Sequence, residues 1–166
     1  MAETPQTIYL KDYTPPAYLI PTVDLSFELE EDFALIHSKL VLEKNQKSGD
    51  VSELFLDGVN LELTSIKING QELHKDDYSL SEDGLTLKKL QNNMVLETSV
   101  RLEPQNNKSF SGLYKTKTVF CTQMEAQGFR HTTFFMDRPD VLSKYSTTIH
   151  ANKTKYPVLL SNGNFV

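Results

Sequence analysis

The residues with the greatest chemical potential lie close together, between Cys121 and Asp140. Within that stretch, Gln123 and Glu125 stand two positions apart. Side chains two positions apart on an extended chain point to the same side. An amide beside a carboxylate can bind a positively charged group that carries N–H donors. The pair therefore indicates a binding cleft, or, as the plainer alternative, a solvent-exposed strand face.

The neighbours of this pair favour the cleft. Gly128 allows a turn or a close approach of the backbone. Pro139 directs Arg138 into an extended or turn conformation. Phe134 and Phe135 stand beside charged residues, a combination typical of a cleft lining.

Other charged residues of the stretch are interpreted as structural. Arg130, Asp137, Arg138 and Asp140 are close enough in sequence to interlock and to hold the loop on the next domain. His131 is expected to be packed or at the surface, because no carboxylate that would orient it as a base can be identified.

The block from Gln123 to Val141, QMEAQGFRHTTFFMDRPDV, resembles the glutamine–x–glutamate–alanine region of the M1 (gluzincin) zinc aminopeptidases. It is most similar to their bacterial aminopeptidase N branch. Residues 12–18, 112–114 and 155–164 resemble the same branch. The resemblance covers nearly the whole chain, strongly from Gly112 onward and more weakly between residues 32 and 107.

This resemblance implies roles for individual residues. Glu125 would bind the α-ammonium group of the substrate, and Gln123 would help to shape the S1 pocket. Met124, on the opposite strand face, is expected to pack. Residues 1–166 would form a single domain, most of the amino-terminal β domain of a larger aminopeptidase. Its partners would be peptides with a free amino terminus and the enzyme's own catalytic domain.

The zinc ligands of the family are not expected in this chain. M1 enzymes bind zinc through H-E-x-x-H and a more distant Glu. None of the four histidines here, which are His37, His74, His131 and His150, is followed by Glu, and no two stand four apart. We therefore expect no catalytic residue and no metal site in this chain. Zinc is expected only in the full-length enzyme, and residues 1–166 alone are expected to be inactive.

Composition narrows the remaining classes. A length of 166 residues suits one domain with a real core, and a net charge of −5 disfavours a nucleic-acid partner. Cys121 is the single cysteine and is interpreted as a small packed residue rather than a nucleophile. The first residues do not form a signal peptide, and no apolar run of about 18 residues is present. The sequence therefore predicts a cytoplasmic protein with no membrane partner.

Alternating apolar residues predict strands. Residues 23–29 and 34–42 alternate and should form an antiparallel hairpin, after a proline-rich extended segment that ends near Pro21. Asn69-Gly70 and Asp83-Gly84 indicate tight hairpins. A change of parity between Leu63 and Ile66 predicts a bulge or a bend.

Further strands are expected at residues 94–102, 147–151 and 158–160, with one helical turn at residues 141–144. No segment shows a sustained 3.6-residue period. The fold class is therefore all-β, an antiparallel β-sandwich or saddle with little or no helix, truncated at its C-terminal edge. An exposed sheet edge would favour pairing between molecules.

Two alternatives to the aminopeptidase domain remain open. One is a non-catalytic β-sandwich that binds protein or glycan. The other is a catalytically silent relative of the M1 enzymes that serves as a scaffold. The co-occurrence of Gln123, Glu125, Gly128 and Arg130 favours the aminopeptidase.

Overall fold

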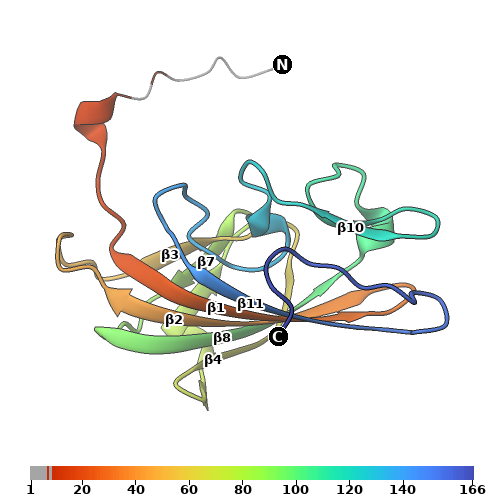
Figure 1. Cartoon of the computed structure of the whole chain (residues 1–166). Coiled ribbons are helices and arrows are strands. Elements are labelled where there is room, and N and C mark those ends of the chain that lie inside the picture. The colour runs from red at the N-terminus through yellow and green to blue at the C-terminus, as the bar shows by residue number, and fades with distance from the viewer. Residues whose placement is uncertain (1–6, 8) are drawn as a thin grey trace.

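The computed structural model describes residue 7 and residues 9–166 (Figure 1). Its main layer is a six-stranded sheet in the order β11-β1-β2-β8-β4-β5. The strands are β1 (Tyr18–Leu29), β2 (Ala34–Lys44), β4 (Glu62–Ile68), β5 (Gln71–Glu72), β8 (Asn93–Leu102) and β11 (Lys144–Ala151). Neighbouring strands are antiparallel except β1 and β11, which are parallel.

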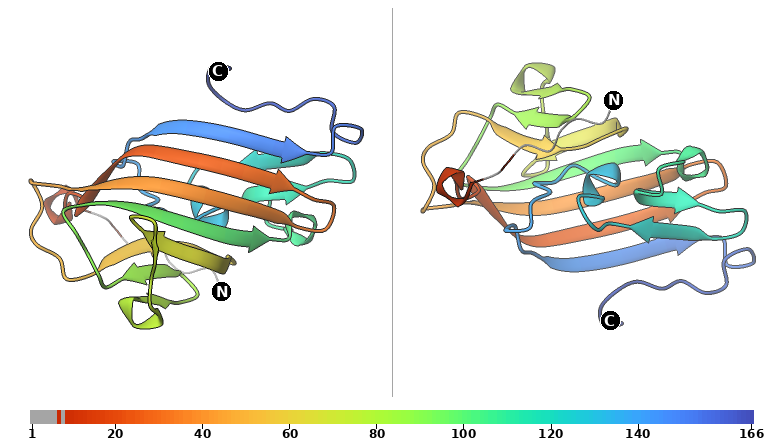
Figure 2. Two further views of the ribbon diagram at one scale, coloured as in Figure 1. Left: turned by 90° about the horizontal axis from the view of Figure 1, so that it is seen from below. Right: turned by 90° about the horizontal axis from the view of Figure 1, so that it is seen from above.

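Two smaller sheets accompany the main sheet. One has the order β3-β7-β6, from β3 (Leu54–Asp57), β6 (Tyr78–Leu80) and β7 (Gly84–Leu87). The other is the hairpin of β9 (Gly112–Lys115) and β10 (Phe120–Gln123). This hairpin and the segment after it lie over one face of the main sheet, and the opposite face is open (Figure 2).

Helical structure in the described part of the chain is limited to four short 3-10 turns. These are η1 (Leu10–Asp12), η2 (Lys75–Asp77), η3 (Pro104–Asn106) and η4 (Phe129–His131). The predicted all-β class is therefore confirmed. The parallel pairing of β11 with β1 is the exception to the predicted antiparallel pattern.

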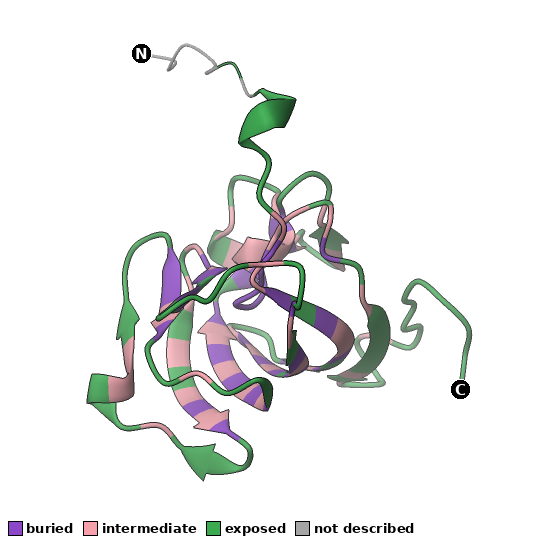
Figure 3. Cartoon of the chain, turned by 90° about the vertical axis from the view of Figure 1, so that its left-hand side faces the viewer, coloured by how far each residue is buried: buried purple, intermediate pink, exposed green. Residues whose placement is uncertain are grey.

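Alternation places one face of each main strand in the core. In β1, Val23, Leu25, Phe27 and Leu29 are buried, while Asp24 and Glu28 are exposed. Figure 3 shows the same alternation along the neighbouring strands. The predicted hairpin of β1 and β2 is confirmed.

The start of β1 differs from the prediction. The strand begins at Tyr18 and includes Pro21, whereas the sequence predicts that Pro21 ends an extended segment before the strand. A register shift between Leu19 and Thr22 surrounds the proline. A bulge is a place where a strand tolerates the missing N–H of proline.

The predicted turn at Asn69-Gly70 is present: the two residues have φ values of 51° and 77°, as a tight β4–β5 hairpin requires. The hairpin predicted at Asp83-Gly84 is displaced, because residues 81–83 connect β6 to β7 and Gly84 already belongs to β7. A register shift between Leu63 and Ser65 confirms the bulge in β4. Gly84 is the first residue of β7, and a side chain there would collide with the backbone of β3.

Two predictions about the later part of the chain are wrong. Residues 141–144 form no helical turn, because Val141 packs into the core and Lys144 already begins β11. Residues 158–160 form no strand. Pro157 before them has no N–H to donate, and Gly163 at φ 96° ends the extended run.

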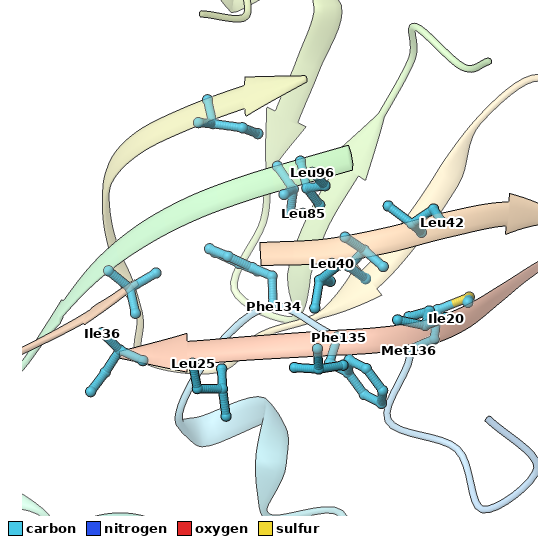
Figure 4. Packing of buried hydrophobic residues seen from close by; sticks show 14 of the residues in the cluster. Ile20, Leu25, Ile36, Leu40, Leu42, Leu85, Leu96, Phe134, Phe135 and Met136 are labelled. Carbon is cyan, nitrogen blue, oxygen red and sulfur yellow. The ribbon is translucent and has the colours of Figure 1, made fainter. Parts of the chain in front are cut away.

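The core lies between the main sheet and the segment that follows β10 (Figure 4). Three consecutive residues of that segment, Phe134, Phe135 and Met136, are 2–5% exposed. They pack with Leu40 and Leu96 of the sheet in one cluster. The stretch from Cys121 to Asp140 is therefore anchored in the core by its own side chains.

Candidate functional site

Gln123 and Glu125 do not share a strand, contrary to the prediction. Strand β10 ends at Gln123, and Glu125 lies in the turn that follows. Both side chains are exposed. The Gln123 Nε2 donates a hydrogen bond to the Glu125 carbonyl oxygen at 2.9 Å. The amide thus caps the backbone of the turn and holds the two residues together.

The Glu125 carboxylate is available to a ligand. No ion pair found among residues 7 and 9–166 includes it. Met124, between the two polar residues, is half-buried, and the Thr132 Oγ1 lies 3.5 Å from its sulfur. Met124 therefore packs, as predicted, while its two neighbours face solvent.

Gly128 closes the turn by a close backbone approach, as predicted. Its N–H donates to the Met124 carbonyl at 2.8 Å. A Cβ at this position would lie 2.5 Å from the Gln123 carbonyl oxygen and 2.8 Å from the Met124 Cα. Gln127, before it, has φ 61°, a conformation that few non-glycine residues adopt. The turn is therefore tight and depends on glycine.

A network around Arg130 fixes the turn to the small β3-β7-β6 sheet. The Arg130 Nε lies 3.0 Å from the Asp137 Oδ2, and its Nη1 lies 3.1 Å from the Asp57 Oδ1. The Asp137 N–H donates to the Asp57 Oδ2 at 3.0 Å. The three side chains are only 14–22% exposed. The predicted interlock of Arg130 and Asp137 is confirmed.

Asp57 is the member of this network that the sequence did not reveal. It ends β3, 80 positions before Asp137, and its backbone also pairs with Phe135. In the sequence, Asp57-Gly58 reads only as a turn. The signal that could have indicated Asp57 is its place directly after a short apolar run.

A second ion pair ties the segment to the N-terminal part of the chain. Arg138 and Asp140 are 2.7 Å apart, and Arg138 also donates to the Thr14 carbonyl at 2.8 Å. The Tyr13 hydroxyl donates to Asp140 at 3.0 Å. The hydrogen bond from Arg138 lowers the pKa of Asp140. The predicted interlock of these two residues is confirmed as well.

The β9–β10 hairpin has its own anchor. The Lys115 Nζ donates to the Glu31 carbonyl at 2.8 Å and lies 3.3 Å from the Glu31 Oε2. The Tyr156 hydroxyl donates to the Glu31 Oε1 at 3.1 Å. The hydrogen bond from Lys115 lowers the pKa of Glu31. This contact joins the β1–β2 turn to the strand pair that carries Gln123.

His131 is half-buried, as a packed histidine would be. It lines a polar cavity of about 1110 Å³ together with Phe134. Burial and, after it, the charge of Arg130 hold the pKa of His131 below its ordinary value. Cys121 is half-buried beside a second cavity.

That second cavity, about 590 Å³, lies behind the turn and is mostly apolar. Its lining includes Met124, Phe129, Phe135 and Tyr145. The prediction that Phe134 and Phe135 line a cleft is therefore correct only in part. Phe134 and Phe135 are core residues that line two different cavities.

The described residues do not fit a metal site. No three His, Cys, Asp or Glu side chains among residues 7 and 9–166 come together as a group that could hold a metal ion. In the same part of the chain, no helix is long and apolar enough to cross a membrane.

Comparison with known families agrees with these features. Residues 21–166 match the Peptidase M1 N-terminal domain. The chain belongs to this family. It is 41% identical over 162 residues to aminopeptidase N of Caulobacter vibrioides. The matched region covers 98% of this chain and 18% of that protein. It is 37% identical over 166 residues to aminopeptidase N of Escherichia coli, and this match covers all of this chain and 19% of that protein.

Solved structures give the same result. The fold matches aminopeptidase A of Legionella pneumophila, solved in complex with aspartic acid, with a TM-score of 0.85 and 34% identity over 93% of this chain and 18% of that one. Native yeast LTA4 hydrolase shares the fold, with a TM-score of 0.64 and 19% identity over 80% of this chain and 23% of that one. The resemblance to M1 enzymes and to bacterial aminopeptidase N is thus confirmed. The chain spans about a fifth of the length of the curated relatives it matches.

Proposed function

We propose that this chain is the part of an M1 metallo-aminopeptidase that binds the free amino terminus of a peptide substrate. One observation supports this above all. Glu125 carries an exposed carboxylate, outside the ion pairs of the described residues, on a turn that is braced on several sides. Asp57 and Asp137, which brace the turn, are both paired with Arg130, so the position of the Glu125 carboxylate is fixed while its charge stays available.

The chemistry of the substrate fits this carboxylate. A peptide α-amino group has a pKa of about 7.7–8.0 and is mostly charged at pH 7. A hydrogen bond from an ammonium to a carboxylate contributes roughly 1.5–3 kcal/mol. Holding the amine at Glu125 also sets the register, because only the first peptide bond then reaches the reacting centre. The role of Glu125 is to position the substrate.

Gln123 is proposed to line the S1 pocket, next to the amine site. One N–H of its amide is used by the Glu125 carbonyl. A primary amide has a second N–H and a carbonyl oxygen, which stay available for contacts with the first substrate side chain. The same hydrogen bond keeps the distance between pocket and amine site fixed.

The family implies zinc, but the residues described here do not fit it. We propose that the zinc and the residues that act on the peptide bond belong to another part of the protein, which residues 1–166 contact as a single domain. We further propose a cytoplasmic location. By this account the 166-residue chain alone has no peptidase activity. Release of an amino acid from a chromogenic amide by pure, zinc-loaded chain would contradict that statement.

The test of the amine site is Glu125→Gln in the longer protein that carries this domain. The substitution keeps the shape and removes the charge. We expect kcat/KM for an unblocked dipeptide amide to fall by about 10- to 150-fold. Glu53→Gln, at an exposed position in the loop before β3, is the matched control and should leave kcat/KM unchanged. Equal activity of both variants would refute the role of Glu125.

A further inference from the structure

The hairpin of β9 and β10 carries an inference that rests on the proposed role of Gln123 in the S1 pocket and extends it. In the part of the chain that the structure describes, these two strands pair only with each other and belong to neither of the other two sheets. Gln123 is the last residue of β10, and its partner across the hairpin is Gly112, the first residue of β9. The position of Gln123 therefore depends on what holds Gly112.

The backbone of Gly112 lies close against η4. A Cβ at this position would lie 2.6 Å from the His131 Cβ and 2.8 Å from the His131 carbonyl oxygen, far inside ordinary contact. Gly112 also has φ 75°, a conformation that favours glycine. Strand β9 can therefore lie at this distance from η4 only with glycine at its first position.

The turn η4 is held too firmly to give way to a larger residue. Arg130, which precedes His131, is held by its ion pairs with two carboxylates. Thr132, which follows His131, is fully buried. A side chain at position 112 would therefore displace β9 and, across the hairpin, Gln123.

A second support holds Gly112 from the chain before it. The Asn107 Nδ2 donates to the carbonyl oxygens of Ser111 and Leu113, at 2.8 and 2.9 Å, so its amide spans the residues on both sides of Gly112. The Asn107 Oδ1 accepts from the Ser109 N–H at 3.0 Å, which fixes the orientation of the amide. The amide nitrogen is thus committed to the start of β9.

We propose that Gly112 and Asn107 are positioning residues that determine which first side chains the S1 pocket accepts. The close approach to His131 sets how near β9 lies to η4, and Asn107 holds the backbone in the conformation that this approach requires. The amide of Gln123 is thereby kept at one distance from the first side chain of the substrate. Both residues act through Gln123 and not by touching the substrate.

Displacement of Gln123 has a signature that a loss of stability lacks. A less stable enzyme loses the same fraction of its activity toward every substrate, because fewer molecules are folded. A displaced Gln123 changes the fit of different side chains by different amounts. The ratio of kcat/KM between two substrates therefore reports the position of Gln123, and a displacement of about 1 Å is enough to alter a rate strongly.

Gly112→Ala in the longer protein that carries this domain is the first test. We expect the ratios of kcat/KM among the p-nitroanilides of alanine, leucine and arginine to change by about 2- to 10-fold, as for one weakened hydrogen bond. Gly70→Ala is the matched control, because Gly70 has φ 77° and nothing lies within 4 Å of its added carbon. It should keep the unmodified ratios. Equal changes in both variants would assign the effect to backbone strain and overturn the role of the contact with η4.

Asn107→Asp tests the second support without adding a side chain at position 112. The substitution replaces the donating nitrogen with an oxygen that faces two carbonyl oxygens. We expect the same ratios to change by about 2- to 10-fold. Asn92→Asp, at an exposed position before β8, makes the same chemical change and should leave the ratios unchanged. If Gly112→Ala does not fold, this pair of variants decides the question.

Gln123→Leu separates this inference from the proposed function on which it rests. The substitution removes the polar atoms of the side chain at similar size, and we expect it to change the ratios most. Ratios that change in Gln123→Leu but not in Gly112→Ala or Asn107→Asp would overturn the positioning role alone. Ratios that stay the same in Gln123→Leu would overturn the S1 role of Gln123 and this inference with it.

Discussion

The Asp57 Oδ1 lies 3.1 Å from the Arg130 Nη1, although the two residues belong to different parts of the chain. Asp57 ends β3 in a small sheet, and Arg130 lies in η4, directly after the turn that carries Glu125. The contact therefore connects the turn that carries Glu125 to a sheet that contributes no residue to it. Rigidity of the turn is a property of the whole domain.

Removing the charge of Asp57 should loosen this connection. Asp57→Asn leaves the half-buried Arg130 with Asp137 as its one acidic partner in the network, and we expect the free energy of unfolding to fall by about 1–3 kcal/mol. Urea denaturation of the isolated chain measures this change in the free energy of unfolding. Asp76→Asn, at an exposed position in η2, is the control and should change stability little. Equal stability of the two variants would show that the contact contributes nothing.

Gly128 is a position at which the turn leaves no room for a side chain. A Cβ there would lie within 3 Å of two backbone atoms of residues 123 and 124, so Gly128→Ala should destabilise the turn by about 1–3 kcal/mol. The N–H of residue 128, which donates to the Met124 carbonyl, should then exchange with solvent faster in Gly128→Ala than in the unmodified chain. Gly49→Ala is the matched control, because nothing lies within 4 Å of its added carbon. Unchanged exchange in Gly128→Ala would contradict the tight turn.

Most of the fold could be predicted because it depends on local patterns. Alternation in β1 and the Asn69-Gly70 turn are visible in neighbouring residues, and they specify strands and a hairpin. The failures lie where one residue overrides its surroundings. Pro157 and Gly163 prevent the strand expected at residues 158–160, and core packing of Val141 replaces the expected helical turn.

The candidate site was predictable only where it is local. Gln123, Glu125 and Gly128 lie within six positions of one another, and the resemblance to M1 enzymes implies roles for Gln123 and Glu125. Asp57 and Glu31 reach the site from other elements, across 73 to 84 positions of sequence. Such contacts follow from how the sheets pack, and no spacing rule in one sequence reveals them.

The contact between Glu31 and Lys115 makes stability depend on pH. The hydrogen bond from Lys115 holds the pKa of Glu31 below its ordinary value in the folded state. A lowered folded-state pKa contributes stability above the unfolded pKa of about 4.3, and that stability is lost as pH falls through the folded pKa. We therefore expect Glu31→Gln to be less stable than the unmodified chain at pH 7, with the difference shrinking below pH about 4.

Denaturant unfolding of both proteins between acid and neutral pH measures this difference. Glu53→Gln serves as control, since Glu53 is exposed in the loop before β3. Its difference from the unmodified chain should stay near zero at every pH. A Glu31→Gln difference that is the same in acid as at pH 7 would mean that the charge of Glu31 has no part in the contact.

Phe134 tests whether the site segment is itself part of the core. The side chain is 2% exposed, packs with residues of the main sheet, and would collide with any side chain at Gly58. Burial of this kind predicts a loss of about 3–5 kcal/mol for Phe134→Ala, from lost contacts and from the cavity left behind. Phe110→Ala, at a position 61% exposed, should cost far less. If Phe134→Ala lowers the unfolding free energy no more than Phe110→Ala, the segment only rests on the sheet. If the full loss is seen, the chain that follows the turn carrying Glu125 is held in the core, and the turn is anchored at that end.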